Sequence, residues 1–67
     1  MSFHENLRRA RKMAEMTQQE LAEAVEVCQK DISRWENGKR TPGLDSLVKI
    51  CRALEVSADD LLEIWPE

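Results

Sequence analysis

The apolar side chains of this 67-residue chain recur every three or four positions along most of its length. No stretch alternates with a period of two for long enough to predict a strand, so the pattern predicts an all-α domain. Ser2 and Glu5 are spaced as a capping box, which places the start of a first helix at this point. The inner face of that helix is predicted to consist of Phe3, Leu7, Ala10 and Ala14.

Two more helices are predicted between residues 17 and 38. Thr17 and Glu20 form a second capping box, which opens a short helix. A third helix is predicted from about Cys28 to Asn37, with Gly38 ending it in a left-handed conformation. The inner face of the second helix is expected to carry Leu21, Ala22 and Val25, and that of the third Cys28, Ile32 and Trp35.

A Pro-Gly turn at 42–43 precedes a fourth predicted helix, Leu44 to Leu54. Ser57, followed by Asp59 and Asp60, predicts the start of a fifth helix. The side chains expected to face inward from the fourth helix are Leu44, Leu47, Val48, Ile50, Cys51 and Leu54.

The helices are joined by a local pattern of an apolar residue, Glu, an apolar residue and a helix cap, which occurs at 14–17, 25–28 and 54–57. Joints this short need a residue with positive φ, a conformation that suits glycine. Glu15, Glu26 and Glu55 fill the position here. Replacing Glu26 or Glu55 with Gly is therefore predicted to stabilise the fold, and the second apolar residue of each joint is predicted to plug the core.

Residues 17–37 combine two helices and a joint of about three residues, the arrangement of a helix-turn-helix. At 100° per residue, the polar side chains of the predicted helix from about Cys28 to Asn37 lie opposite its apolar face. That outer face consists of Lys30, Ser33, Arg34 and Asn37, with Gln29 on its flank. Such groups can hydrogen-bond to base edges in DNA, but a polar outer face is also the ordinary solvated side of a helix.

The residues around this face favour the DNA interpretation. Gln18 lies in the first turn of the preceding helix, where free N–H groups can hold a phosphate oxygen. Asn37, Lys39 and Arg40 follow the outer face, and we expect them to contact phosphates on the other side of a groove.

The motifs TQQELA at 17–22, VEVC at 25–28 and ISRWENGK at 32–39, with Pro42 and the apolar run at 47–54, resemble the Cro/cI-type helix-turn-helix repressors, or XRE family. The resemblance covers residues 3 to about 62. It implies a single, five-helix, lambda-repressor-like DNA-binding domain across residues 1–67, which dimerises on palindromic operators and regulates transcription, usually as a repressor. The roles it implies are phosphate contact by Gln18, base contact by Gln29, Lys30, Ser33 and Arg34, backbone contact near Asn37 and Lys39, and an ion pair between Arg11 and Glu36.

The chain departs from the family pattern at four positions. Glu15, Glu26 and Glu55 stand where the family usually has Gly, and Cys28 stands where it has Ser or Thr. Glu26 is expected to weaken non-specific DNA binding by charge repulsion. Cys28 is interpreted as a half-buried replacement for a capping Ser, with a redox switch as the alternative.

The formal charge of −3 argues against a protein that coats nucleic acid by bulk charge. Its distribution weakens that argument, because residues 1–43 carry eight basic and seven acidic side chains, whereas residues 44–67 carry two and six. We expect the acidic surplus to keep non-specific binding low, so that binding depends on base contacts.

Other chemistry finds little support in the sequence. His4, Cys28 and Cys51 supply three soft ligands where a structural zinc needs four, so no metal is expected. His4 is predicted to be solvated and Cys51 to pack in the core. The sequence has neither a nucleophile–base pair nor a Gly-rich phosphate loop, and it predicts no enzyme, no cofactor and no small-molecule ligand. With no apolar run of about 18 residues and no signal-like start, we expect a cytoplasmic protein that does not enter a membrane.

Four large apolar residues lie within five positions near the C-terminus, namely Leu61, Leu62, Ile64 and Trp65. Since a small core needs few of them, we predict a homodimer interface at Leu62, Ile64 and Trp65, with Leu44 or Val48 adding to it. Residues 64–66 could instead be extended and pair across the dimer. The alternative function is an antitoxin or controller-type module that binds a co-transcribed protein.

Overall fold

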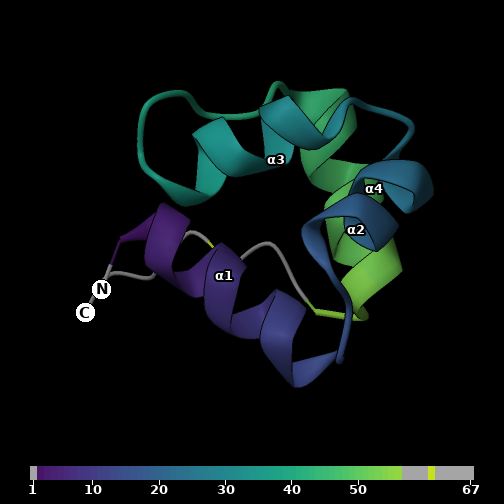
Figure 1. Cartoon of the computed structure of the whole chain (residues 1–67). Helices are drawn as coiled ribbons and strands as arrows, with labels where there is room; N and C mark the ends of the chain where they lie inside the picture. Colours follow the sequence, from purple (N-terminus) through teal and green to yellow (C-terminus); the bar gives the residue numbers. More distant parts are fainter. Residues whose placement is uncertain (1, 57–60, 62–67) are drawn as a thin grey trace.

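The computed structural model of the chain describes residues 2–56 and 61, and among them it contains four helices and no strand. The helices are α1 (Phe3–Met13), α2 (Gln18–Val25), α3 (Gln29–Glu36) and α4 (Leu44–Leu54). α2 packs against both α3 and α4, and α1 packs against α3 (Figure 1). None of these helices is long and apolar enough to cross a membrane. The all-α prediction is confirmed, whereas the predicted start of a fifth helix at Ser57, Asp59 and Asp60 lies outside the described residues.

One core unites the four helices. Its buried members are Leu7, Leu21, Ala22, Val25, Ile32, Trp35, Ile50, Leu54 and Leu61. Leu61 is only 1% exposed, and its carbonyl oxygen accepts a hydrogen bond from Asn6 Nδ2 at 3.0 Å. Leu61 therefore belongs to the core of its own chain and not to the partner surface predicted from the C-terminal apolar cluster.

Four predicted core positions were wrong. Leu44 and Val48 are 76% and 42% exposed. They lie one turn apart on α4, beside the face that Ile50 and Leu54 bury. Ala14 is exposed because α1 ends at Met13 and Ala14 is its C-cap. Cys28 is likewise exposed, since it is the N-cap of α3 and precedes the helical face that Ile32 and Trp35 bury.

The helix joints adopt the predicted left-handed conformation. Glu15, Glu26 and Glu55 have φ values of 59°, 67° and 58°, and Gly38 after α3 has 76°. The next residue in each Glu joint donates its N–H five residues back, with the bonds Met16 to Arg11, Val27 to Ala22 and Val56 to Cys51 measuring 3.2, 2.9 and 3.1 Å. These donors are also partly buried against the core, as predicted.

Gly38 packs closely against the first turn of α1. A Cβ at Gly38 would lie 3.1 Å from His4 Nδ1, so glycine here serves both the positive φ and the close approach. His4 is half-buried, and its Nδ1 lies 2.9 Å from Ser2 Oγ. His4 is therefore solvated on one side only, because Gly38, just after α3, lies against its ring.

Candidate nucleic-acid interface

α3 is held by its apolar side and presents its polar side outward. Ile32 and Trp35 are buried, whereas Gln29, Lys30 and Arg34 are exposed. Ser33 is partly buried beside them. Together with α2 and the joint at 26–28, α3 forms a helix-turn-helix within the predicted limits of 17–37.

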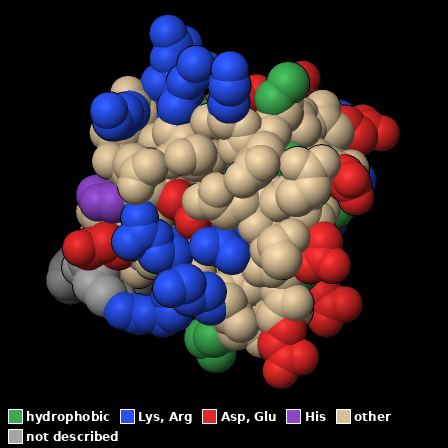
Figure 2. Space-filling model, in the orientation of Figure 1, with side chains coloured by type: hydrophobic (Ala, Val, Ile, Leu, Met, Phe, Trp, Pro, Cys, Tyr) green, Lys and Arg blue, Asp and Glu red, His purple; other side chains and the backbone are tan. Residues whose placement is uncertain are grey.

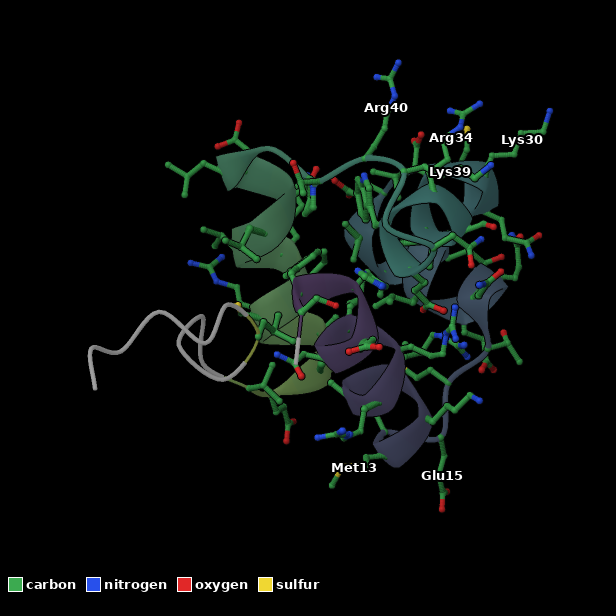
Figure 3. The ribbon with its side chains drawn as sticks, turned by 90° about the vertical axis from the view of Figure 1, so that its left-hand side faces the viewer. Met13, Glu15, Lys30, Arg34, Lys39 and Arg40 are labelled. Atoms are coloured by element: carbon green, nitrogen blue, oxygen red, sulfur yellow. The ribbon has the colours of Figure 1, made fainter. Side chains whose placement is uncertain are left out.

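A shallow groove of about 290 Å³ runs along this outward side, lined by Lys30, Ser33, Arg34, Asn37 and Lys39. The side chains of Lys30, Arg34, Lys39 and Arg40 project from the same end of the molecule, opposite the end that carries Met13 and Glu15 (Figure 3). On the face shown in Figure 2, one group of basic side chains lies at the top over α3 and the loop that follows, a second group lies at the lower left, and acidic side chains line the right-hand edge. The structure thus brings five of the predicted DNA-contacting residues together in one groove.

Two acidic side chains near this surface are paired. Asp31 Oδ1 lies 3.5 Å from Arg34 Nη1, and both side chains are partly exposed. Glu26 accepts a hydrogen bond from Lys49 Nζ at 2.8 Å, and Lys49 lowers the pKa of Glu26 below its ordinary value through this bond and through its charge. Lys49 therefore offsets part of the repulsion expected between Glu26 and a phosphate backbone.

Gln18 and Gln29 lie side by side at the start of α2 and α3. Gln18 Nε2 donates to Glu36 Oε1 at 3.1 Å, and Gln18 Oε1 accepts from Gln29 Nε2 at 3.3 Å. The side chain of Gln18 thus links a buried carboxylate to the outer face of α3. Sequence reasoning did not predict these two bonds, because they depend on the tertiary position of Glu36.

Arg11 and Glu36 form the ion pair that the sequence resemblance implied. Arg11 Nε and Nη2 donate to the two oxygens of Glu36, at 2.5 and 3.1 Å, and Arg11 Nη1 donates to the Met16 carbonyl oxygen at 2.8 Å. The Glu36 side chain is fully buried and that of Arg11 is 12% exposed. With the bond from Gln18, this carboxylate connects α1, α2 and α3 and fixes the orientation of the helix-turn-helix.

Sequence reasoning missed Arg8. Its Nη2 donates to the Glu36 carbonyl oxygen and to Asn37 Oδ1, both at 3.1 Å. The available signal was its place three residues before Arg11, on the side of α1 that meets α3.

The remaining predicted site residues divide by position. Leu62, Ile64 and Trp65 lie outside the described residues. Cys51 is partly buried, which raises the pKa of its thiol. Among residues 2–56 and 61, no three His, Cys, Asp or Glu side chains cluster as metal ligands.

The sequence is similar to helix-turn-helix regulators. A profile of the family described as Helix-turn-helix matches residues 7–61. The chain is 40% identical over 62 residues to the HTH-type transcriptional activator BcrR of Enterococcus faecalis, covering 92% of this chain and 30% of that protein. It is 34% identical over 65 residues to the cryptic phage CTXphi transcriptional repressor RstR of Vibrio cholerae, covering 97% and 58%. The chain therefore spans less than two thirds of the length of these curated relatives.

The fold is similar to that of two solved proteins over nearly the whole chain. One is the P22 c2 repressor protein in complex with a synthetic operator, with a TM-score of 0.90, 32% identity and coverage of 94% of this chain and 96% of that one. The other is the restriction-modification controller protein C.AhdI from Aeromonas hydrophila, with a TM-score of 0.84, 25% identity and coverage of 90% and 91%. By its sequence over residues 7–61 and by its fold, the chain belongs to the helix-turn-helix family of transcriptional regulators.

Proposed function

We propose that this protein binds double-stranded DNA sequence-specifically, with α3 in the major groove, and regulates transcription from the sites it occupies. The outer side of α3 supports this proposal most directly, because Lys30, Ser33 and Arg34 line a basic groove there and Gln29 is exposed at the start of the same helix. Arginine and lysine donate to guanine, and glutamine pairs with adenine. Gln18, Asn37, Lys39 and Arg40 are proposed to contact phosphates around this face.

Repression by occupancy is the simplest action for such a domain. A protein bound to an operator within a promoter excludes other proteins from the same DNA. RstR and the P22 c2 protein are named repressors, which supports this action here, whereas BcrR is named an activator.

A selection of bound sites from random double-stranded DNA tests the proposal. We expect an enriched motif whose two halves are inverted repeats, and we expect Arg34→Ala to weaken binding to it by roughly ten- to a hundredfold. Arg52→Ala is the matched control, because Arg52 is an exposed arginine on α4, outside the groove of α3. A pool with no enriched sequence would contradict sequence-specific binding.

The palindromic motif belongs to a second part of the proposal, which is that the protein acts as a homodimer. Leu44 and Val48 are exposed one turn apart on α4 and form an apolar strip available to a second copy. We propose that this strip and the segment with Leu62, Ile64 and Trp65 form the interface. A two-fold dimer would present its two α3 helices to half-sites about one DNA turn apart.

Sedimentation equilibrium tests the interface with a matched pair of variants. We expect Leu44→Ser to raise the dimer dissociation constant at least roughly tenfold, because it removes apolar area from the interface. Ala24→Ser should leave the constant unchanged, because it makes a similar change at an exposed position of α2, outside the proposed interface. A dimer that both Leu44→Ser and Trp65→Ala leave intact would place the interface elsewhere.

The similarity to a restriction-modification controller protein favours a second candidate, in which the same fold serves a controller or antitoxin that works with a co-transcribed protein. The gene neighbourhood discriminates the two. An adjacent co-transcribed restriction or toxin gene, whose product co-purifies with this chain, would support the second candidate. A free-standing gene beside its own palindromic site would support the first.

A further inference from the structure

Arg8 caps the C-terminal end of α3 from a different helix. Its Nη2 donates to the Glu36 carbonyl oxygen at 3.1 Å, one of the last carbonyls of α3, which have no partner within the helix. A guanidinium at this end also interacts favourably with the helix dipole. Arg8 thereby joins the end of α3 to α1.

The same Arg8 nitrogen determines the orientation of the Asn37 amide. Arg8 Nη2 donates to Asn37 Oδ1 at 3.1 Å, so the amide nitrogen points the other way. Asn37 Nδ2 then donates to Ser33 Oγ at 3.2 Å, one turn earlier on α3. Because the terminal torsion of asparagine is broad and roughly two-fold, Arg8 favours one of two amide orientations that would otherwise compete.

The orientation of Asn37 in turn decides what Ser33 offers to a ligand in the groove. A serine hydroxyl has one hydrogen to donate and lone pairs that accept. Since Ser33 Oγ accepts from Asn37, its own hydrogen remains for an acceptor in the groove that Ser33 lines. With the amide reversed, Ser33 would donate to Asn37 Oδ1 and would present only lone pairs.

We propose that Arg8 is a positioning residue that acts through Asn37 to make Ser33 a hydrogen-bond donor toward DNA bases. The proposal rests on the DNA-binding function proposed above. In the major groove, guanine, adenine and thymine each present an acceptor, whereas cytosine presents only its N4 donor. Ser33 therefore selects against cytosine at the operator position that it faces.

The proposal is tested by measuring affinity for a set of operator variants, in which each position is replaced in turn by each of the four bases. The position that Ser33 faces is the one whose base preference disappears in Ser33→Ala. The wild type should bind cytosine there roughly tenfold more weakly than the best base. Asn37→Asp should abolish this penalty, because a carboxylate accepts from both Arg8 and Ser33 and takes up the Ser33 hydrogen.

Arg8→Gln should reduce the cytosine penalty to about twofold, since the Asn37 amide is then free to reverse. Lys12→Gln is its control, because it removes the same charge one turn later on α1, where Lys12 is exposed. It should lower affinity equally for all four bases. Thermal melting verifies that each variant is folded, and the exposed Asn37 provides an independent variant if Arg8→Gln is not.

Two results would overturn the inference while leaving DNA binding intact. Arg8→Gln could weaken all four bases equally and keep the cytosine penalty, which would make Arg8 only a structural or phosphate-contacting residue. Asn37→Asp could keep the penalty, which would show that the amide does not set the polarity of Ser33. A wild-type protein that enriches no sequence would instead overturn the proposed function itself.

Discussion

Glu26 and Glu55 occupy equivalent left-handed positions at helix ends but differ in what their side chains contact. Both have positive φ. This conformation lowers the folding stability of a residue with a Cβ, and it carries no such penalty for glycine. Glu26 is held by Lys49 at 2.8 Å, whereas Glu55 forms no ion pair with the described residues. Replacement by glycine should therefore help more at Glu55 than at Glu26.

We predict that Glu55→Gly raises the free energy of unfolding by some tenths up to about 1 kcal/mol, because relief of backbone strain exceeds the added entropy of the unfolded chain. Thermal or urea unfolding measures the change. Glu55→Ala, which removes the carboxylate and keeps the Cβ, should give no such gain. A lower melting temperature for Glu55→Gly would show that this position is not strained.

The buried ion pair of Arg11 and Glu36 also makes the stability of the fold depend on single residues. Arg11→Met leaves the fully buried Glu36 carboxylate without its main partner, so we predict a loss of about 3 kcal/mol in unfolding free energy. The double variant Arg11→Met with Glu36→Met should recover much of this loss, because no uncompensated charge remains. Urea unfolding of the two singles and the double closes the cycle. Additive losses would contradict the coupling.

Some features of single residues could be predicted from the sequence and others could not. The left-handed glutamates were predictable, because the apolar-Glu-apolar pattern is local. The inward turn of Gln18 was not, since it depends on the buried Glu36 carboxylate, which α1 and α3 position together. Arg8 was missed for the same reason, because its long side chain spans two helices that are distant in sequence.

Among the helices, the N-terminus of α3 is less completely capped than that of α2. Thr17 accepts a hydrogen bond from the Glu20 N–H at 3.0 Å and Glu20 accepts one from the Thr17 N–H at 2.8 Å, which is a complete capping box. Cys28 is the N-cap of α3, and its side chain accepts no capping bond. In α3, one of the first backbone N–H groups therefore lacks the hydrogen-bond acceptor that a Ser side chain at position 28 would supply.

Cys28→Ser should raise the free energy of unfolding by roughly 0.5–1 kcal/mol, because serine accepts a backbone N–H at this position and cysteine accepts it poorly. Circular dichroism during thermal unfolding measures the shift. Cys28→Ala is the comparison that isolates the hydroxyl. Equal melting temperatures for the serine and alanine variants would mean that the cap contributes nothing here.

The helices themselves were predictable, because their caps and apolar periods are local. The bounds of α4 agree with the predicted Leu44 to Leu54, and α3 differs only in that Cys28 and Asn37 are its caps. The error lay in which side of α4 is buried. Six apolar positions cover more of that helix than the small core contacts, and Leu44 and Val48 remain outside.

At the scale of the whole molecule, the position of the charges matters more than their sum. The chain carries a formal charge of −3, yet Lys30, Arg34, Lys39 and Arg40 project from one end (Figure 3). Charged groups elsewhere are screened over about 10 Å at moderate salt, so a bound duplex would mainly experience this local surface. The protein can therefore be acidic overall and still present a basic face.

Lys39→Ala should weaken binding to every DNA sequence by a similar factor and reduce the slope of log affinity against log salt by about 1, because it removes one phosphate contact. Titrations at several salt concentrations measure the slope. Arg52→Ala, on α4, should leave the slope unchanged. A changed base preference in Lys39→Ala would assign Lys39 to base reading instead.

We propose that the outer face of α3 reads a base sequence and is not only a basic surface. The most direct measurement is the ratio of affinities for the selected operator and for a shuffled duplex of the same composition, at one salt concentration. We predict a ratio of at least about a thousandfold for the wild type, and a ratio reduced by ten- to a hundredfold in Arg34→Ala. Equal affinities of the wild type for the two duplexes would contradict the claim.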